Sequence, residues 1–287
     1  NNSLNIAQAT EKVNYSLSLG SSDQSGIIPT TGMKRYNAKG TAELKLNSNW
    51  TTGFSANYVN TSIDKLPTAN DGILATVFPA PPSYDLAGIP AHIVNNPYVQ
   101  NNYRGGSFAA AYWMLDNVNF DEQTSRFYGN AYANYKTKFH TDNHTLNVKY
   151  QLGTDAYTTD FENVWGYGSK GSSKNGQIEN YGWKSVMLNS LLTISYDWKI
   201  NSDWSFDALL GNEFIQNNRR RYYEYGDSFN FPGWNHISNA TSKNNEINDL
   251  TNRTVGFFGS ASAAYKNMLY LTVTGRNDYV SNMPTGN

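Results

Sequence analysis

Cysteine is absent from the 287 residues, which excludes a disulfide framework and any metal site built on thiolates. Charged residues are scarce at 16%, and 22 Lys+Arg against 23 Asp+Glu give a formal net charge of −1. A near-neutral chain offers little attraction to phosphates, so we expect no nucleic-acid partner.

Long apolar runs are also missing. No segment approaches the roughly 18 apolar residues of a transmembrane helix, and the mean hydropathy is −0.61. The first five residues, Asn1 to Asn5, lack the charged and apolar regions of a signal peptide. We therefore expect a mature chain or an internal piece of an exported protein. Low hydropathy still permits a membrane β-barrel, because its strands are apolar on one face only.

The sequence is rich in segments that alternate between apolar and polar residues, the pattern of β-strands with two unlike faces. In residues 36–46, Tyr36, Leu44 and Leu46 share one face, whereas Lys39 and Glu43 lie on the other. We predict ten such strands, at about 3–9, 12–20, 36–46, 49–61, 126–139, 146–155, 186–200, 203–216, 252–266 and 268–278.

Charged residues of these segments fall on the polar faces. Because a Lys or Arg facing the middle of a bilayer costs roughly 2–4 kcal/mol, this segregation favours strands in contact with lipid. The residues concerned are Lys39, Glu43, Lys45, Lys136, Lys138, Lys149, Asp155, Asp197, Lys199, Asp207, Glu213, Lys266, Arg276 and Asp278.

The connections alternate in length. We predict short periplasmic turns at about 10–12, 47–49, 140–144, 201–203 and 266–267, and long outer loops at about 21–35, 62–125, 157–185 and 217–251. Tight turns at one end and long loops at the other are typical of outer-membrane barrels. Residues 1–287 are therefore predicted to form one all-β domain, a transmembrane antiparallel meander of the bacterial outer membrane.

Four aromatic residues lie beside the predicted short turns, on the apolar faces. They are Trp50, Trp198, Trp204 and Tyr265. Their rings fit an aromatic girdle at the membrane–water interface, although the general preference of aromatics for strands also accounts for them.

Three groups of motifs, in order along the chain, resemble SusC/RagA-family TonB-dependent outer-membrane transporters. The first comprises Leu17-Ser18-Leu19-Gly20, residues 23–27 and Lys34-Arg35-Tyr36-Asn37; the second Tyr112-Trp113, Ser125-Arg126 and Gly129-Asn130; the third residues 275–279 with Ser281 and Pro284. One departure is that Ala110-Ala111 precede Tyr112-Trp113, where the family usually has Asn-Pro. An Asn96-Pro97-Tyr98 sequence occurs separately in the same predicted loop.

The resemblance implies a 22-strand barrel, of which this chain would supply ten strands, the second to the eleventh. The family's plug domain and the later half of the barrel have no counterpart in the sequence. The resemblance further implies a SusD-like lipoprotein lid as partner, coupling to the TonB complex through the missing plug, and import of oligosaccharides or peptides. Outer-membrane lipid and lipopolysaccharide would surround the barrel.

Aromatic residues of the predicted outer loops are the candidate ligand contacts, because their faces stack on sugars and pack on peptides. Packing of the loops against one another accounts equally well for any single member. The candidates are Tyr98, Tyr103, Tyr112, Trp113, Trp165, Trp183 and Trp234, with Tyr84 and Tyr167 in the same loops.

Other motifs have simpler explanations. His140 and His144 have a spacing that would suit zinc on a helix, but they fall in a predicted turn, so we expect no metal and no cofactor. Asp121-Glu122 is interpreted as a solvated loop tip and not as a glycosidase pair. Arg219-Arg220-Arg221 would either grip an anionic ligand or lipopolysaccharide, or anchor the interface.

We therefore predict the passive wall of an importer and not an enzyme. Its polar face, with Lys39, Glu43, Lys149, Asp207 and Glu213, would contact the plug and water. The alternative is a soluble, cell-surface all-β carbohydrate-binding protein, which would need no detergent.

Overall fold

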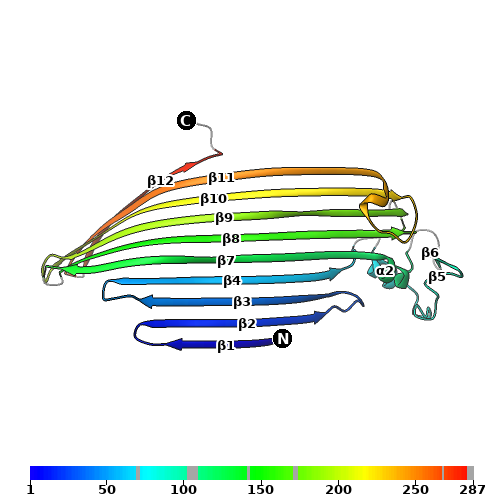
Figure 1. The fold of residues 1–287 in the computed structure, drawn as a ribbon, viewed down its shortest axis with the longest axis horizontal. Helices are drawn as coiled ribbons and strands as arrows, with labels where there is room; N and C mark the ends of the chain where they lie inside the picture. Colours follow the sequence, from blue (N-terminus) through cyan, green and yellow to red (C-terminus); the bar gives the residue numbers. More distant parts are fainter. Residues whose placement is uncertain (69–71, 102–108, 141–142, 171–173, 267, 283–287) are drawn as a thin grey trace.

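The computed structural model describes residues 1–68, 72–101, 109–140, 143–170, 174–266 and 268–282. Ten strands form one antiparallel sheet in which each strand pairs with the next long strand along the chain (Figure 1). They are β1 (Asn2–Ala9), β2 (Val13–Ser25), β3 (Gly32–Lys45), β4 (Trp50–Lys65), β7 (Val118–Phe139), β8 (His144–Tyr167), β9 (Asn175–Lys199), β10 (Trp204–Phe229), β11 (Ala240–Tyr265) and β12 (Leu269–Val280). This confirms the all-β fold and the ten-strand meander. β1 and β12 are the two edges of the sheet and do not pair with each other.

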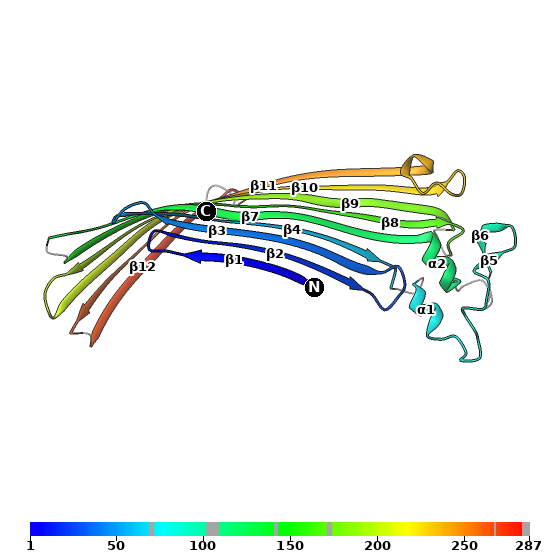
Figure 2. The same ribbon diagram turned by 60° about the horizontal axis from the view of Figure 1, so that its bottom comes forward.

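All other elements lie at one end of the sheet. The connection from β4 to β7 contains α1 (Ile73–Val77), a hairpin of β5 (His92–Ile93) and β6 (Asn96–Gln100), and α2 (Ala111–Asn117) (Figure 2). A short 3-10 helix, η2 (Ile237–Asn239), precedes β11. Within the described residues, no helix has the length and apolarity needed to cross a bilayer.

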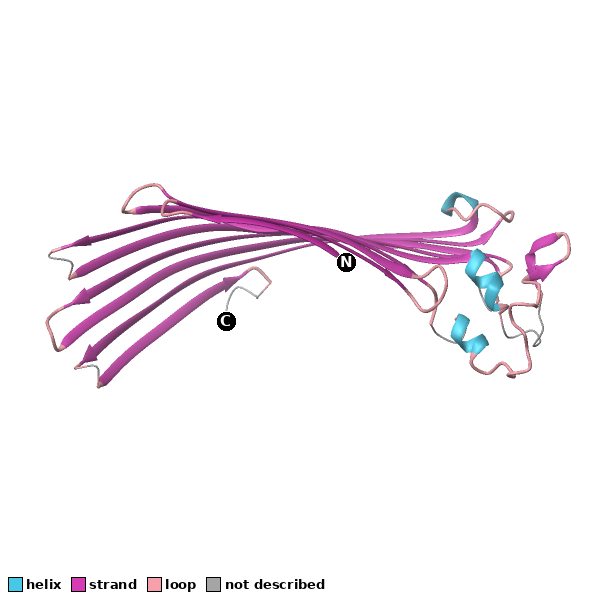
Figure 3. Cartoon of the chain, turned by 90° about the horizontal axis from the view of Figure 1, so that it is seen from below, coloured by secondary structure: helices cyan, strands magenta, loops and turns pink. Residues whose placement is uncertain are grey.

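At the opposite end, the fully described connections are tight turns, at 10–12, 46–49 and 200–203, whereas the predicted turns at 140–144 and 266–267 include residues outside the described ranges (Figure 3). Two of them are built alike. The side-chain oxygen of Asn47 accepts hydrogen bonds from the backbone N–H of Asn49 and Trp50, at 2.8 and 2.9 Å. Asn201 does the same for Asp203 and Trp204, at 2.9 Å each. Asn favours such turns because its short side chain replaces a backbone acceptor.

The predicted long outer loops need correction. The connections at this end are 26–31, 66–117, 168–174 and 230–239, because β8 to β11 continue through most of the ranges 157–185 and 217–251. β7 to β11 are 22 to 26 residues long, whereas β2 to β4 have 13 to 16. The outer parts of these strands have polar residues on both faces, so hydrophobic alternation does not reveal them.

The register divides the strand residues between two faces of the sheet. Leu17 pairs with Gly40, which pairs with Ala56, which pairs with Gly129. Following the register across all ten strands places most of the large apolar residues on this same face, which we call the apolar face. Lys39, Glu43 and the other strand charges named above lie on the opposite, polar face. The charge segregation predicted from the sequence therefore extends across the neighbouring strands, but it ends towards the outer side, where Lys184, Arg220 and Arg253 lie on the apolar face.

The apolar face is extensively exposed. Its large, exposed side chains include Leu4, Ile6, Leu17, Leu19, Phe54, Phe127, Leu152, Leu188, Ile194, Leu210, Phe257, Leu271 and Val273. A soluble monomer rarely exposes an apolar patch of more than a few hundred Å². The wall of a membrane barrel has to present such a face to lipid.

The apolar face is free of charge over a defined length. In β9 it extends from Trp198 to Val186, and the next residue on this face is Lys184. These thirteen residues rise by about 3.3 Å each, and a strand tilt of about 40° converts this to a band about 30 Å high. That height matches the hydrocarbon core of a membrane, so β8 to β11 continue well beyond it on the side away from the tight turns.

Two small buried clusters lie at the outer end. In the first, Trp113 and Met114 of α2 are each 1% exposed and pack with Leu66, Ile73 and Val118. The second joins η2 to the sheet through Ile178, Phe229 and Ala240. These clusters fix the outer connections on the strands that hold the candidate site.

Candidate functional site: the polar face of the sheet

The outer half of the polar face carries a group of aromatic rings contributed by adjacent strands. Phe161 of β8 and Tyr181 of β9 occupy paired positions, and their rings are parallel with centroids 4.7 Å apart. Tyr223 of β10 pairs with Tyr181 and lies 6.4 Å from it, and Tyr225 lies 6.5 Å from Tyr223. We call Phe161, Tyr181, Trp183, Tyr223 and Tyr225 the aromatic platform. Alternation along each strand sends these side chains to the same face as the lumen-side charges.

Polar groups border the platform. The hydroxyl of Tyr223 donates to Glu179 Oε1 at 3.2 Å, and Asn163 Nδ2 donates to the Tyr181 hydroxyl at 3.5 Å. Burial, together with the negative charge of Glu179, raises the pKa of Tyr223. The phenol therefore remains a hydrogen-bond donor through the physiological pH range. A surface of aromatic faces edged by donors and acceptors suits a ligand with both apolar and hydroxyl or amide groups.

Trp183 joins the platform to a cation. Its ring lies 5.6 Å from that of Phe161, and the guanidinium of Arg219 lies over it at 5.4 Å from the ring centroid. The run Arg219-Arg220-Arg221 is split by the strand alternation. Arg219 and Arg221 lie on the polar face, whereas Arg220 lies on the other face and pairs with Asp249 at 2.8 Å.

Ion pairs link neighbouring strands on the polar face. Arg126 donates through Nε to Asp155 at 2.8 Å, and its Nη2 donates to the other oxygen of the same carboxylate. Lys65 pairs with Glu122 at 2.6 Å. Such pairs lock the strands in register and leave the paired cations unavailable to a ligand.

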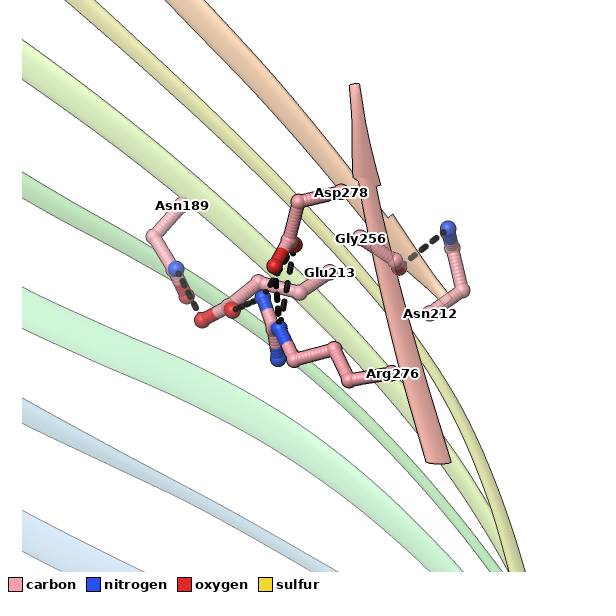
Figure 4. A network of polar contacts seen from close by, with 6 residues as sticks. All are labelled: Asn189, Asn212, Glu213, Gly256, Arg276 and Asp278. Atoms are coloured by element: carbon pink, nitrogen blue, oxygen red, sulfur yellow. Dashed lines mark hydrogen bonds and ion pairs between the residues drawn. The ribbon is translucent and has the colours of Figure 1, made fainter. Parts of the chain in front are cut away.

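A third ion network crosses a whole strand. Arg276 of β12 contacts Glu213 of β10 at 2.8 Å and also binds Asp278 on its own strand (Figure 4). The intervening position on β11 is Gly256, where a Cβ atom would lie 2.5 Å from Arg276 Nη2. The missing side chain is what allows the arginine to reach across. Asn189 extends the network by donating to Glu213 at 3.4 Å.

The structure places the candidate ligand aromatics named from the sequence in different surroundings. Trp183 belongs to the platform, whereas Trp165 packs edge-on against Phe120 with ring centroids 5.5 Å apart. Trp113 is an interior residue, 1% exposed, whose Nε1 donates to the Pro97 carbonyl at 2.8 Å. We therefore withdraw Trp113 as a ligand contact, because its ring holds α2 in place.

The remaining candidates are scattered over the outer connections. Tyr98 is partly buried in β6, and Tyr112 is 44% exposed on α2. Trp234, in the connection before β11, stacks on His236 with centroids 5.2 Å apart. Tyr103 and the motif residue Pro284 lie outside the described residues.

The sequence-based choice missed Phe161, Tyr181, Tyr223 and Tyr225. These residues fall in ranges where the sequence predicts loops, so no face is assigned to them. The signal that could have found them is the two-residue period of a strand, because the odd-numbered residues of these ranges continue the polar face of the predicted strands. In β8, residues 157–165 continue the odd-numbered polar face of the predicted strand before them, and in β9 residues 177–185 continue that of the predicted strand after them.

The four predicted interface aromatics lie at the tight-turn end of the apolar face, Trp50 on β4 and the other three on the adjacent strands β9, β10 and β11. Trp50 packs on Tyr135 with centroids 5.0 Å apart, and Trp204 packs on Tyr265 at 4.8 Å. Trp198 stacks on His144 at 5.5 Å. Their place at the end of the charge-free band agrees with a girdle, which stays a prediction.

The histidine pair is part of this aromatic group. The rings of His140 and His144 lie 5.5 Å apart, and His144 Nδ1 is 2.6 Å from the Tyr196 hydroxyl. In the part of the chain that the structure describes, no three His, Cys, Asp or Glu side chains gather in a way that could hold a metal ion. His144 therefore has a stacking and hydrogen-bonding role.

No family model matches this chain. A curated relative is similar to nearly its whole length. This relative, the TonB-dependent receptor P26 of Formosa agariphila, is 24% identical over 296 aligned positions, which cover 97% of this chain and 28% of the relative. The chain thus spans little more than a quarter of that protein's length.

Solved structures of the RagAB peptide transporter share the fold. One superposes with a TM-score of 0.75 at 16% identity and covers 99% of this chain and 32% of the other. The open-open and closed-closed states of the RagAB peptide importer give 0.75 and 0.72, with the same coverage. The partial sheet thus corresponds to part of a larger barrel. In sequence and in fold, this chain resembles part of the β-barrel of the SusC/RagA-type TonB-dependent transporters.

Proposed function

We propose that the chain forms part of the wall of a TonB-dependent importer and that its polar face captures an oligosaccharide or a peptide. The observation that carries this proposal is the unlike character of the two faces. One is apolar and free of charge over about 30 Å, and the other bears paired charges and the aromatic platform. A barrel wall between lipid and an aqueous lumen needs both.

The platform supplies the chemistry for capture. Parallel rings at 4.7 Å present apolar surface, and the Tyr223 hydroxyl and Asn163 amide supply hydrogen bonds at its edge. Sugars offer C–H faces to such rings, and peptides offer apolar side chains. RagAB, which shares the fold, is a peptide transporter, and this supports the peptide alternative.

The rest of the machinery would lie in other parts of the protein or in partner chains. Residues 1–287 would supply ten strands of a 22-strand barrel. Further strands would pair with β1 and β12, because unpaired sheet edges are not viable in lipid. A plug in the lumen would couple to the TonB complex, and a SusD-like lipoprotein would close over the outer connections. In this scheme no residue of the chain is catalytic. A soluble carbohydrate-binding protein is disfavoured by the exposed apolar face.

Uptake by cells that carry the full-length protein tests the proposal. We expect Phe161→Ala combined with Tyr181→Ala to reduce uptake of the substrate at least about tenfold, which is about 1.4 kcal/mol of lost binding. Tyr270→Ala is the matched control, because this exposed polar-face tyrosine lies near the tight turns and away from the platform. Outer-membrane levels of all variants should be equal. Undiminished uptake by the double variant at equal levels would overturn the role of the platform.

A further inference from the structure

Four arginines form a stripe across the polar face, next to the aromatic platform. Arg35 of β3 lies in the same row of paired residues as Arg221 of β10, connected through Thr61, Thr124 and Thr159. Arg126 and Arg219 occupy the adjacent row. We call Arg35, Arg126, Arg219 and Arg221 the arginine stripe. From β3 to β10 it spans five strand spacings, about 24 Å.

Positive side chains outnumber carboxylates in and beside the arginine stripe. Across the two rows of the stripe and the next row towards the membrane, the only acidic side chain among the described polar-face residues is Asp155. Asp155 is fully engaged by Arg126. Arg35, Arg219 and Arg221 are exposed, and no carboxylate of the described chain lies within ion-pair distance of them.

This contrasts with other arginines of the chain. Arg220 on the opposite face binds Asp249, and Arg276 binds both Glu213 and Asp278. Apart from Asp155, the acids nearest to the stripe lie one row further out, on the side away from the membrane. Glu122 is taken by Lys65, and Glu246 lies beside Tyr223. Among the described arginines of the polar face, those without a carboxylate partner therefore all lie in the stripe.

The side chains between the arginines are hydroxyls and rings. The hydroxyls of Thr124 and Thr159 are 3.0 Å apart and lie between Arg35 and Trp183 along the row. Trp183 stacks under Arg219, which leaves the outer edge of the guanidinium free to donate. A guanidinium binds a carboxylate or sulfate through two parallel hydrogen bonds.

We propose that the arginine stripe selects an anionic oligosaccharide, with carboxylate or sulfate groups on Arg35, Arg219 and Arg221 and sugar faces against Trp183. This inference rests on the proposed import function and narrows its substrate class. A sugar chain fits better than an acidic peptide, because threonine hydroxyls match sugar hydroxyls along the row. The stripe lies within one sheet face, so an extended ligand would cross the strands.

Binding to the full-length protein in mild detergent tests the proposal by titration calorimetry. The probes are a galacturonate hexasaccharide, a sulfated galactan hexasaccharide, an uncharged galactan hexasaccharide and hexaglutamate. We expect one or both anionic sugars to bind at least about tenfold more tightly than the uncharged sugar, which is about 1.4 kcal/mol. Raising the ionic strength from about 0.05 M to about 0.5 M should remove most of that difference.

Substitutions locate the effect. Arg221→Gln should weaken binding of the anionic sugar about tenfold and leave the uncharged sugar unaffected. Arg219→Gln, which also removes the cation from the Trp183 ring, should weaken binding of the anionic sugar about tenfold more than binding of the uncharged sugar. Arg220→Gln is the matched control, because it removes the same charge from the same strand but on the opposite face. Circular dichroism and heat-dependent gel mobility verify that each variant is folded.

The outcomes separate this inference from the proposed function. Equal binding of charged and uncharged sugars, insensitive to the arginines, overturns the stripe but leaves the aromatic platform and import intact. Arginine-dependent binding of hexaglutamate alone overturns the saccharide class. If cells with the wild-type protein take up no sugar or peptide at all, the proposed function itself fails.

Discussion

Leu152→Arg places a positive charge in the middle of the apolar face. Leu152 is 52% exposed and lies in β8 between His144 and Thr158, the first and last residues of the charge-free stretch of that strand. With a rise of about 3.3 Å and a tilt of about 40°, it lies about 20 Å from the tight-turn end and about 15 Å from the outer end. A charge at that depth cannot reach water without deforming the bilayer.

The expected cost follows from depth. An Arg near the bilayer midplane lowers the free energy of unfolding by about 2–4 kcal/mol, whereas near the interface the loss is about 0–1 kcal/mol. Ala156→Arg lies on the same face but only two residues from Thr158, so it should cost the smaller amount. Gln151→Arg is the neighbouring residue on the polar face and should change the free energy by less than about 0.5 kcal/mol.

Reversible urea unfolding of the full-length protein in lipid vesicles measures these free energies, with tryptophan fluorescence as the signal. The order of loss should be Leu152→Arg, then Ala156→Arg, then Gln151→Arg. Equal losses for Leu152→Arg and Gln151→Arg would refute the assignment of the apolar face to lipid. A larger loss for Gln151→Arg would mean that the faces are reversed.

Three further predictions concern packing and charge. Trp113→Ala should lower the free energy of unfolding by about 3–5 kcal/mol, seen as a lower urea midpoint, because it empties a buried ring site. Gly256→Ala puts a Cβ 2.5 Å from Arg276 Nη2, so the guanidinium has to move away from Glu213, and the loss of this exposed ion pair should cost about 0.2–1 kcal/mol in the same assay, whereas Gly275→Ala, with no atom within 4 Å of its Cβ, should be nearly neutral. Burial raises the pKa of Asp121, so its ionisation opposes folding as pH rises through that pKa. Asp121→Asn should therefore raise the urea midpoint at neutral pH and leave it unchanged in acid, below the ordinary aspartate pKa; a gain in acid would contradict this.

Strand alternation is readable in the sequence wherever one face meets lipid. Residues such as Leu188, Leu192 and Ile194 alternate with polar neighbours, because one face of the strand is apolar. Further out, around Tyr181 and Tyr223, both faces meet polar surroundings. The strands continue there through pairing with their neighbours, and the sequence carries no amphipathic signal for them. This is why the sequence pattern predicts loops at 157–185 and 217–251, where the structure has strands.

The sequence also does not predict which aromatic residues are buried and which are exposed. Tyr112 and Trp113 are adjacent and similar in character, yet one is 44% and the other 1% exposed. The difference depends on how α2 packs against Leu66 and Ile73, which are distant in sequence. A choice of candidates based on residue type could not separate them.

By itself the sequence determined the class of strand and which side chains share a face, because strand alternation is a local property of two-residue period. It also carried the motifs that resemble SusC/RagA transporters. Only the tertiary structure decided which residues lie in one row, because register is set by hydrogen bonding between strands far apart in the chain. Arg35 and Arg221 lie in the same row of the sheet for that reason. Arg219 and Arg220, adjacent in sequence, lie on opposite faces. Arg219 lies on the polar face, whereas Arg220 lies on the opposite face and is paired with Asp249.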